Sequence, residues 1–165
     1  MRRFVAALVL LLATAAHAQP ARTPGRADAA SLRTLLTGLG YQPREAGNGV
    51  NGDYEIVVRV SDGLTITTRV TLSRDGSLVW LVAWLRSVPR GRTINGNAVL
   101  DMLQENDQIG PTHFSYSESE SGRWFFLNRP IVNQDLTVDR LRSELTQLVG
   151  IVVRTEALWN PDRWR

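Results

Sequence analysis

Three consecutive segments in the first half of the chain have the two-residue periodicity of β-strands, and the third differs from the other two. In segments 54–61 and 64–73, apolar residues alternate with polar ones. Each segment therefore has one apolar face, as expected of antiparallel strands with one side in solvent. Segment 77–86 is apolar on both faces. A sheet that contains this segment must bury it on both sides or leave an apolar row uncovered.

The first turn between these segments decides whether their apolar rows share a face. A two-residue Asp62-Gly63 turn would pair Ser61 with Leu64 and put the rows on opposite faces. A three-residue turn with Gly63 left-handed pairs Val60 with Leu64 and puts both rows on one face. We therefore predict the three-residue turn.

The second turn, at Asp75-Gly76, orients the third strand. By analogy with the first turn, we predict that the row containing the tryptophans faces the core. This row consists of Leu78, Trp80, Val82 and Trp84. A two-residue turn would reverse the two faces. In either case one apolar row is left on the opposite side of the sheet.

Helical periodicity precedes, separates and follows the strands. A helix begins at the capping residue Asp28 and stops at Gly40, a loop spans 41–52, and a short helix covers 97–106. A second hairpin covers 112–128, and its second arm is apolar on both faces at 124–127. Thr137 caps a last helix that runs to Trp159. The order α-β-β-β-α-β-β-α predicts an α+β domain.

The N-terminal residues predict export. Arg2 and Arg3 precede an apolar stretch, 4–16, and Ala16-His17-Ala18 is the pattern that signal peptidase cuts. The stretch is too short to span a bilayer core of about 30 Å, and an uncleaved anchor would leave that pattern unused. We predict a bacterial signal peptide, 1–18, cleaved after Ala18. The expected product is periplasmic or secreted and has no stable membrane anchor.

The mature chain is predicted to be one domain. Residues 19–27 are expected to be a flexible leader, 28–161 the domain and 162–165 a C-terminal tail. With no Cys in the chain, the domain must be stabilised by apolar burial. Signal cleavage removes two Arg, which lowers the formal net charge from +3 to +1. The remaining Arg residues are scattered, so no nucleic-acid partner is expected.

The sequence contains no recognisable catalytic, metal or cofactor motif. His113 is the one histidine of the mature chain, and it starts a strand without a Ser/Asp partner motif. Zinc or iron ligation would need more His or Cys. The segment 115–121 alternates Ser with Tyr116, Glu118 and Glu120, and it is predicted to be a solvated hairpin tip. We therefore expect neither an enzyme nor a cofactor.

The two-faced apolar strands allow two interpretations. Both strands could be central, with helices on both sides of the sheet. Alternatively, the helices cover one face, and the row left over serves a homodimer or another polypeptide. The candidate residues for this partner-binding surface are Val79, Leu81, Leu85, and Phe125 or Leu127.

Residues 98–161 carry the firmest resemblance to known proteins. The features that carry it are Leu103-Gln104-Glu105-Asn106 at the end of the short helix, Phe114 in a hairpin, Leu127-Asn128-Arg129-Pro130-Ile131, Leu136-Thr137, and Trp159-Asn160-Pro161. In these and in element order, the chain resembles the YbjN family and the class I type III secretion chaperones. The resemblance implies a twisted antiparallel sheet with helices packed on it, no cofactor and no catalytic residues.

In the chaperones, the resemblance also implies homodimers that hold an extended segment of a partner. Those chaperones act in the cytoplasm, whereas this chain has an export signal. The expected function is that of an exported, non-enzymatic YbjN-like domain that binds a polypeptide. The alternative is an envelope small-ligand binder or enzyme with a pocket beneath the loop 41–52.

Overall fold

The computed structural model describes residues 25–47, 52–61, 63–120 and 122–164. The predicted signal peptide and most of the predicted leader lie outside these residues. The helices are α1 (Ala29–Gly38), α2 (Gly96–Asn106), α3 (Val138–Arg154), α4 (Glu156–Trp159) and the 3-10 turn η1 (Pro161–Arg163). The strands are β1 (Arg44–Glu45), β2 (Asp53–Ser61), β3 (Leu64–Leu72), β4 (Leu78–Val88), β5 (His113–Ser119) and β6 (Gly122–Val132).

The six strands form one antiparallel sheet in the order β1-β2-β3-β4-β6-β5. The α+β class and the predicted element order are confirmed. Two details differ from the predictions. The expected loop 41–52 contains β1, which pairs with Tyr54 and Glu55, and the last helix breaks at Thr155, whose hydroxyl donates to the Ile151 carbonyl at 2.7 Å.

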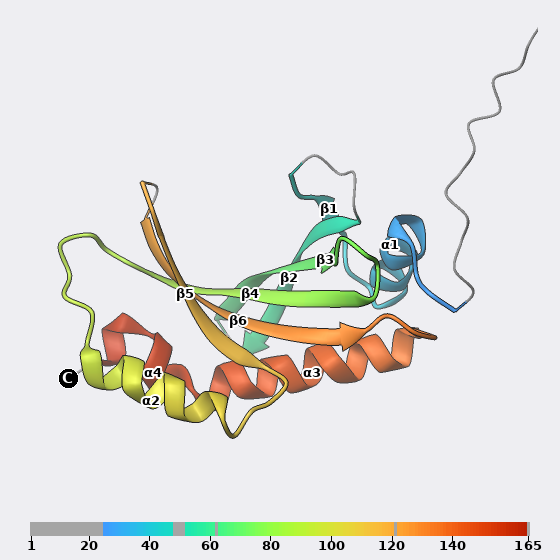
Figure 1. Cartoon of the computed structure of the whole chain (residues 1–165). Coiled ribbons are helices and arrows are strands. Elements are labelled where there is room, and N and C mark those ends of the chain that lie inside the picture. Colours follow the sequence, from blue (N-terminus) through green and yellow to red (C-terminus); the bar gives the residue numbers. More distant parts are fainter. Residues whose placement is uncertain (1–24, 48–51, 62, 121, 165) are drawn as a thin grey trace, which may run out of the picture.

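The described helices pack on one side of the sheet. In Figure 1, α2, α3 and α4 run along its lower side, and α1 lies beside the end of the sheet near β3. The core forms where these helices meet the sheet, around Leu141, Leu145 and Leu148 of α3 and Leu32 and Leu36 of α1. Within the described residues, no helix is long and apolar enough to cross a membrane.

The apolar rows of β2 and β3 lie on one face, as predicted, but the predicted three-residue turn is wrong. Val58 lies opposite Ile66 and Tyr54 lies opposite Val70, and all four are buried. The pairing next to the turn differs from the prediction, because Ser61 rather than Val60 lies opposite Leu64. A register shift between Arg59 and Ser61 absorbs the extra residue.

The second turn contains an even number of residues rather than the predicted odd number. The predicted orientation of β4 is therefore wrong, and its two faces are reversed. Val70 lies opposite Leu81 and Leu72 opposite Val79, so these residues of β4 face the helices. Trp80 lies opposite the polar Thr71 on the other side.

The hydrogen bonds of Asp75 explain the length of this turn. One of its carboxylate oxygens accepts hydrogen bonds from the Ser73 hydroxyl at 2.6 Å, the Ser77 hydroxyl at 2.8 Å and the Ser77 amide at 3.1 Å. The first backbone pair beyond the turn joins the Ser73 amide to the Leu78 carbonyl at 2.9 Å. Four residues, 74–77, therefore separate the strands. An even number exchanges the faces relative to a three-residue turn.

β6 is longer than the predicted arm and includes Pro130, opposite Trp80. A proline in a central strand would break the ladder, because it has no N–H to donate. In β6, however, the even-numbered residues turn their amides toward β5, and β5 ends at His113, opposite Asn128. The nitrogen of Pro130 therefore points to the side where no strand of the described residues lies, so no hydrogen bond of the sheet is lost there.

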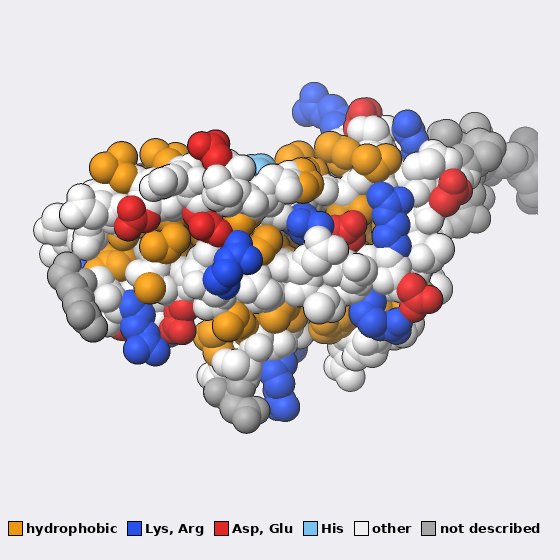
Figure 2. All heavy atoms as spheres, turned by 90° about the horizontal axis from the view of Figure 1, so that it is seen from below, with side chains coloured by type: hydrophobic (Ala, Val, Ile, Leu, Met, Phe, Trp, Pro, Cys, Tyr) orange, Lys and Arg blue, Asp and Glu red, His pale blue; other side chains and the backbone are white. Residues whose placement is uncertain are grey.

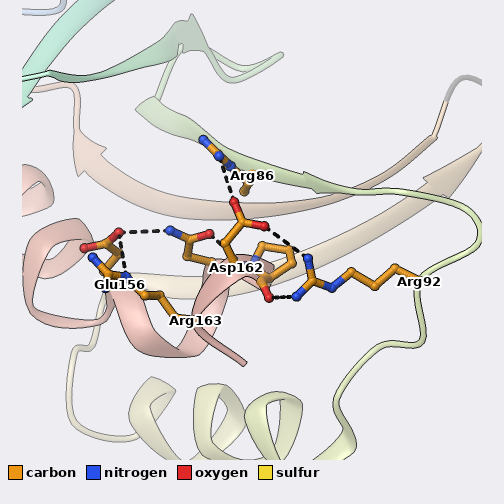
Figure 3. Close-up of polar contacts among 7 residues, drawn as sticks. Arg86, Arg92, Glu156, Asp162 and Arg163 are labelled. Carbon is orange, nitrogen blue, oxygen red and sulfur yellow. Dashed lines mark hydrogen bonds and ion pairs between the residues drawn. The ribbon is translucent and has the colours of Figure 1, made fainter. Parts of the chain in front are cut away.

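The packed domain continues beyond the predicted boundary at 161. The Trp164 ring packs edge-on to Phe125 at 6.1 Å, and its Nε1 donates to the Leu158 carbonyl at 2.8 Å. Asp162 accepts hydrogen bonds from Arg86 at 2.8 Å and Arg92 at 3.1 Å (Figure 3). These guanidiniums lower the pKa of the Asp162 carboxyl below its usual value. The residues expected to form a tail thus hold the C-terminus against β4 and the loop that follows it.

Candidate functional site

The side of the sheet without helices carries an apolar area, interrupted on β6 by Asn128, which we call the aromatic face. Its residues come from alternate positions of the two central strands. They are Leu78, Trp80, Val82 and Trp84 of β4 and Trp124, Phe126, Pro130 and Val132 of β6. All are partly buried except Val132, which is exposed. Three of the five tryptophans of the chain are therefore in this area.

Ring-on-ring contacts order the centre of the aromatic face. Trp84 meets Trp124 at a centroid distance of 5.6 Å and Phe126 at 5.2 Å, both edge-to-face. Edge-to-face pairs at these distances contribute about 0.5–1.5 kcal/mol beyond area burial. The rings thus form a preorganised surface, which a ligand would not have to order.

Trp84 also carries an unsatisfied donor. Its Nε1 is one of three buried side-chain polar atoms without a hydrogen-bond partner among the described residues. A buried donor without an acceptor costs about 1–3 kcal/mol, and buried tryptophan N–H groups usually find a partner. The indole N–H is therefore an unsatisfied donor buried beneath the rings of this face.

Polar side chains flank the aromatic face on both sides. On β5, His113, Ser115 and Ser117 lie opposite Asn128, Phe126 and Trp124. On β3, Arg69 donates from Nε to Oδ1 of Asp53 at 2.5 Å and from Nη2 to Oδ2. This hydrogen bond is the main cause of the raised pKa of Arg69. The face therefore has an apolar centre, a border on β5 that is rich in hydroxyl groups, and a border on β3 where Arg69 is already paired with Asp53.

The predicted partner-binding residues lie on the other side of the sheet. Val79, Leu81 and Leu127 are fully buried in the core, Phe125 is 2% exposed, and Leu85 packs partly buried against them. They cannot form a free surface, because α3 and its neighbours cover them. The leftover apolar row exists, but it is the tryptophan row. The hydrogen-bonding residues of Ser73-Arg74-Asp75-Gly76-Ser77 were the local signal for the turn length that decides this.

The other candidates named from the sequence do not converge on a reactive centre. His113 lies at the start of β5, and its ring is T-shaped to that of Trp80, with 6.2 Å between the ring centroids. On the hairpin, the Tyr116 hydroxyl donates to Glu118 at 2.7 Å, and both residues are exposed. Among the described residues, no group of three or more His, Asp or Glu could hold a metal ion.

Sequence reasoning missed a polar contact at the edge of the sheet. Asn106, the last residue of α2, accepts from the Phe114 amide at 2.6 Å, and its Nδ2 lies 3.4 Å from the Phe114 carbonyl. Its amide occupies the place of a neighbouring strand at this position of β5. The only sequence signal was an Asn at the end of a helix just before a strand.

Figure 2 views the helix-covered side of the molecule. Figure 2 shows small hydrophobic areas there, separated by basic, acidic and other polar side chains. Scattered apolar side chains are normal on protein surfaces, whereas a contiguous area is associated with binding. The aromatic face is therefore the stronger candidate for a protein-binding surface.

The sequence matches no protein-family model and no curated protein. Solved structures share its fold. YbjN from E. coli is 14% identical with a TM-score of 0.55, over 78% of this chain and 90% of that chain. The HopA1–SchA chaperone–effector complex matches at 15% identity and a TM-score of 0.51, over 74% of this chain and 88% of that chain. The chain has a YbjN-like and type III secretion chaperone-like fold.

Proposed function

We propose that this chain is an exported, non-enzymatic module that binds an extended, apolar segment of another polypeptide on its aromatic face. The observation that carries the proposal is that this face, with three tryptophans, has no helix over it. Trp side chains dominate binding energy in protein interfaces, where they bury large areas at a small cost in entropy.

An extended segment suits the shape and chemistry of this surface. Successive side chains of an extended segment point in opposite directions, so alternate residues could rest on the rings of β4 and β6. The serine hydroxyls of β5 could form hydrogen bonds with backbone groups of the segment. Such contacts would tolerate different sequences, since backbone groups and apolar contacts provide most of them.

The structural likeness supports a polypeptide as the occupant. SchA is solved as a chaperone in complex with an effector, HopA1. Here the corresponding activity would take place outside the cytoplasm, as the N-terminal residues 1–18 predict. Export is tested separately: the N-terminus of the protein recovered from the envelope or medium should be Gln19, and an intact Met1 would contradict it.

The binding experiment starts with the mature chain and a displayed library of random peptides. Peptides selected on the wild-type chain are then measured by calorimetry against Trp124→Ser and Trp84→Phe, the second of which removes only the N–H and part of the ring. Leu103→Ser is the matched control, because Leu103 is 58% exposed but lies on α2, on the other side of the sheet. Circular dichroism and urea unfolding verify that each variant folds.

The proposal predicts apolar peptides whose affinity falls about tenfold or more in Trp124→Ser, a loss of about 1.4 kcal/mol, and stays unchanged in Leu103→Ser. Equal loss in all variants, or none in Trp124→Ser, would contradict it. Light scattering tests the other possible occupant of the aromatic face, a second copy of the chain. If the wild-type chain is a dimer and Trp124→Ser is a monomer, a second copy covers the face instead.

A further inference from the structure

A pocket of about 220 Å³ lies on the helix side of the sheet, away from the aromatic face. It opens between the C-terminal end of α1, the strand β2 and the middle of α3. Four apolar side chains form its inner wall: Leu39, Val58, Leu145 and Val149. Val58 and Leu145 are buried members of the core, so this wall is fixed by the packing of the domain.

The mouth of the pocket is cationic. Arg59 and Arg142 contribute to its lining, and no carboxylate does. The Arg59 side chain has no ion pair or hydrogen bond within the described part of the chain. Arg142 bonds to Asp139 at 2.5 Å, one helical turn away, with the Asp139 side chain 89% exposed. Such exposed pairs contribute only about 0.3–0.5 kcal/mol, so an anion could take over this guanidinium.

Tyr41 adds a neutral donor to the same pocket. Burial raises the pKa of its phenol above the usual value, so the hydroxyl stays protonated at neutral pH. This hydroxyl has no hydrogen-bond partner among the residues that the structure describes. The pocket thus joins an apolar wall to one hydroxyl and two guanidiniums.

The volume limits what can bind. A dry cavity of about 150 Å³ holds a benzene molecule, and pockets for drug-sized ligands measure about 300–1,000 Å³. The pocket of about 220 Å³ therefore fits a single ring or a short acyl chain together with one small polar group.

We propose that this pocket binds a small monocarboxylic acid. The ring or acyl chain lies on the apolar wall, Arg59 and Arg142 donate to the carboxylate, and the Tyr41 hydroxyl donates to one of its oxygens. Arginine favours carboxylates because its planar N–H groups match the two oxygens. The site is separate from the proposed polypeptide-binding face, so either can fail without the other.

Benzoate and hexanoate are the probes, titrated into the mature chain and followed by amide chemical shifts. Benzyl alcohol and benzylamine, which have the same ring without the negative charge, are the control ligands. We expect saturable shifts confined to Tyr41, 58–59 and 142–149, with a Kd on the order of 1 mM, and binding of both control ligands that is about tenfold weaker.

Variants separate a charged pocket from nonspecific apolar contact. Arg59→Gln and Arg142→Gln should each weaken benzoate binding about fivefold to tenfold, and Thr146→Met should block the mouth and abolish binding. Arg154→Gln, later on the same helix, should have no effect. Absence of saturation up to about 10 mM, equal binding of benzyl alcohol, or unchanged affinity in both Arg→Gln variants would overturn the proposal.

Discussion

Arg129 of β6 lies under α3 and donates from Nε to Oε2 of Glu144 at 2.6 Å. The same guanidinium donates to the Thr112 hydroxyl at 2.7 Å and to Oε1 of Gln147 at 2.6 Å. Its side chain is only 8% exposed. One buried cation thus connects the longest helix, a central strand and the segment before β5.

Replacing Glu144 with Ala is expected to destabilise the domain by about 2–4 kcal/mol, because Arg129 would stay buried without its counter-ion. The apolar exchange Arg129→Met combined with Glu144→Gln should cost less than Glu144→Ala alone, since no buried charge remains. Urea unfolding at neutral pH measures both. Glu105→Ala, which removes the half-buried partner of the exposed Arg154, is the control and should cost less than about 1 kcal/mol. If Glu144→Ala costs no more than this control, Arg129 does not depend on the pair.

Asn133→Ala should destabilise the N-terminal part of the domain. The buried Asn133 amide donates to the carbonyls of Ala27 at 2.8 Å and Gly76 at 2.9 Å, and its oxygen accepts from the Ala27 amide at 3.1 Å. Losing these bonds is expected to cost about 2–3 kcal/mol. Hydrogen exchange should accelerate first in α1. The neighbouring exposed Gln134→Ala is the control, and similar losses in the two variants would contradict the prediction.

Asp75 should make stability depend on pH in the acid range. Hydrogen bonds from Ser73, then from Ser77, lower its pKa from 3.8 to about 2 in the folded chain. A group with a depressed folded pKa stabilises the fold above its unfolded pKa, and the contribution is lost as the pH falls toward the folded value. The urea midpoints of the wild type and Asp75→Asn should therefore converge between about pH 5 and pH 2. A constant difference over that range would show that the Asp75 carboxylate is not stabilised by folding.

Asn106→Ala should loosen the outer edge of the sheet. It leaves the amide and carbonyl of Phe114 without their partner, at an expected cost of about 1–2 kcal/mol. Unpaired edge positions also promote strand pairing between molecules, so light scattering should detect more self-association. Gln104→Ala, an exposed change on the same helix, should alter neither quantity. Unchanged stability in Asn106→Ala would show that the amide does not protect this edge.

Elements with local signals were predictable from the sequence. Asp28 and Thr137 accept from the amides of Ser31 and Arg140 and begin their helices as expected, since capping depends on neighbouring residues only. The alternation in 54–61 and 64–73 predicted two strands with one buried face each. These patterns reflect which side of a strand meets water.

Features that depend on residues distant in the sequence, or on small energy differences between alternatives, were not predictable. The strand β1 has two residues, too few for a periodic pattern. Arg129 and Asn133 interrupt an apolar row and gave no sign that their partners lie on α3 and near α1. Leu103 fits the apolar side of its helix but is exposed. An uncovered apolar row was expected, but the tryptophan row was assigned to the wrong side, because the side depends on whether three or four residues form one turn.

That turn has a consequence for how the gene can vary. Residues 74–77 are exposed or half-buried, so a single substitution there leaves the packing of the core in place even where it weakens the turn. The loss or gain of one codon has a larger effect, because it would reverse the two faces of β4. Trp80 and Trp84 would then face the helices, and Val79 and Leu81 would face the opposite side. Insertions and deletions, rather than substitutions, are therefore what purifying selection should remove from this short stretch.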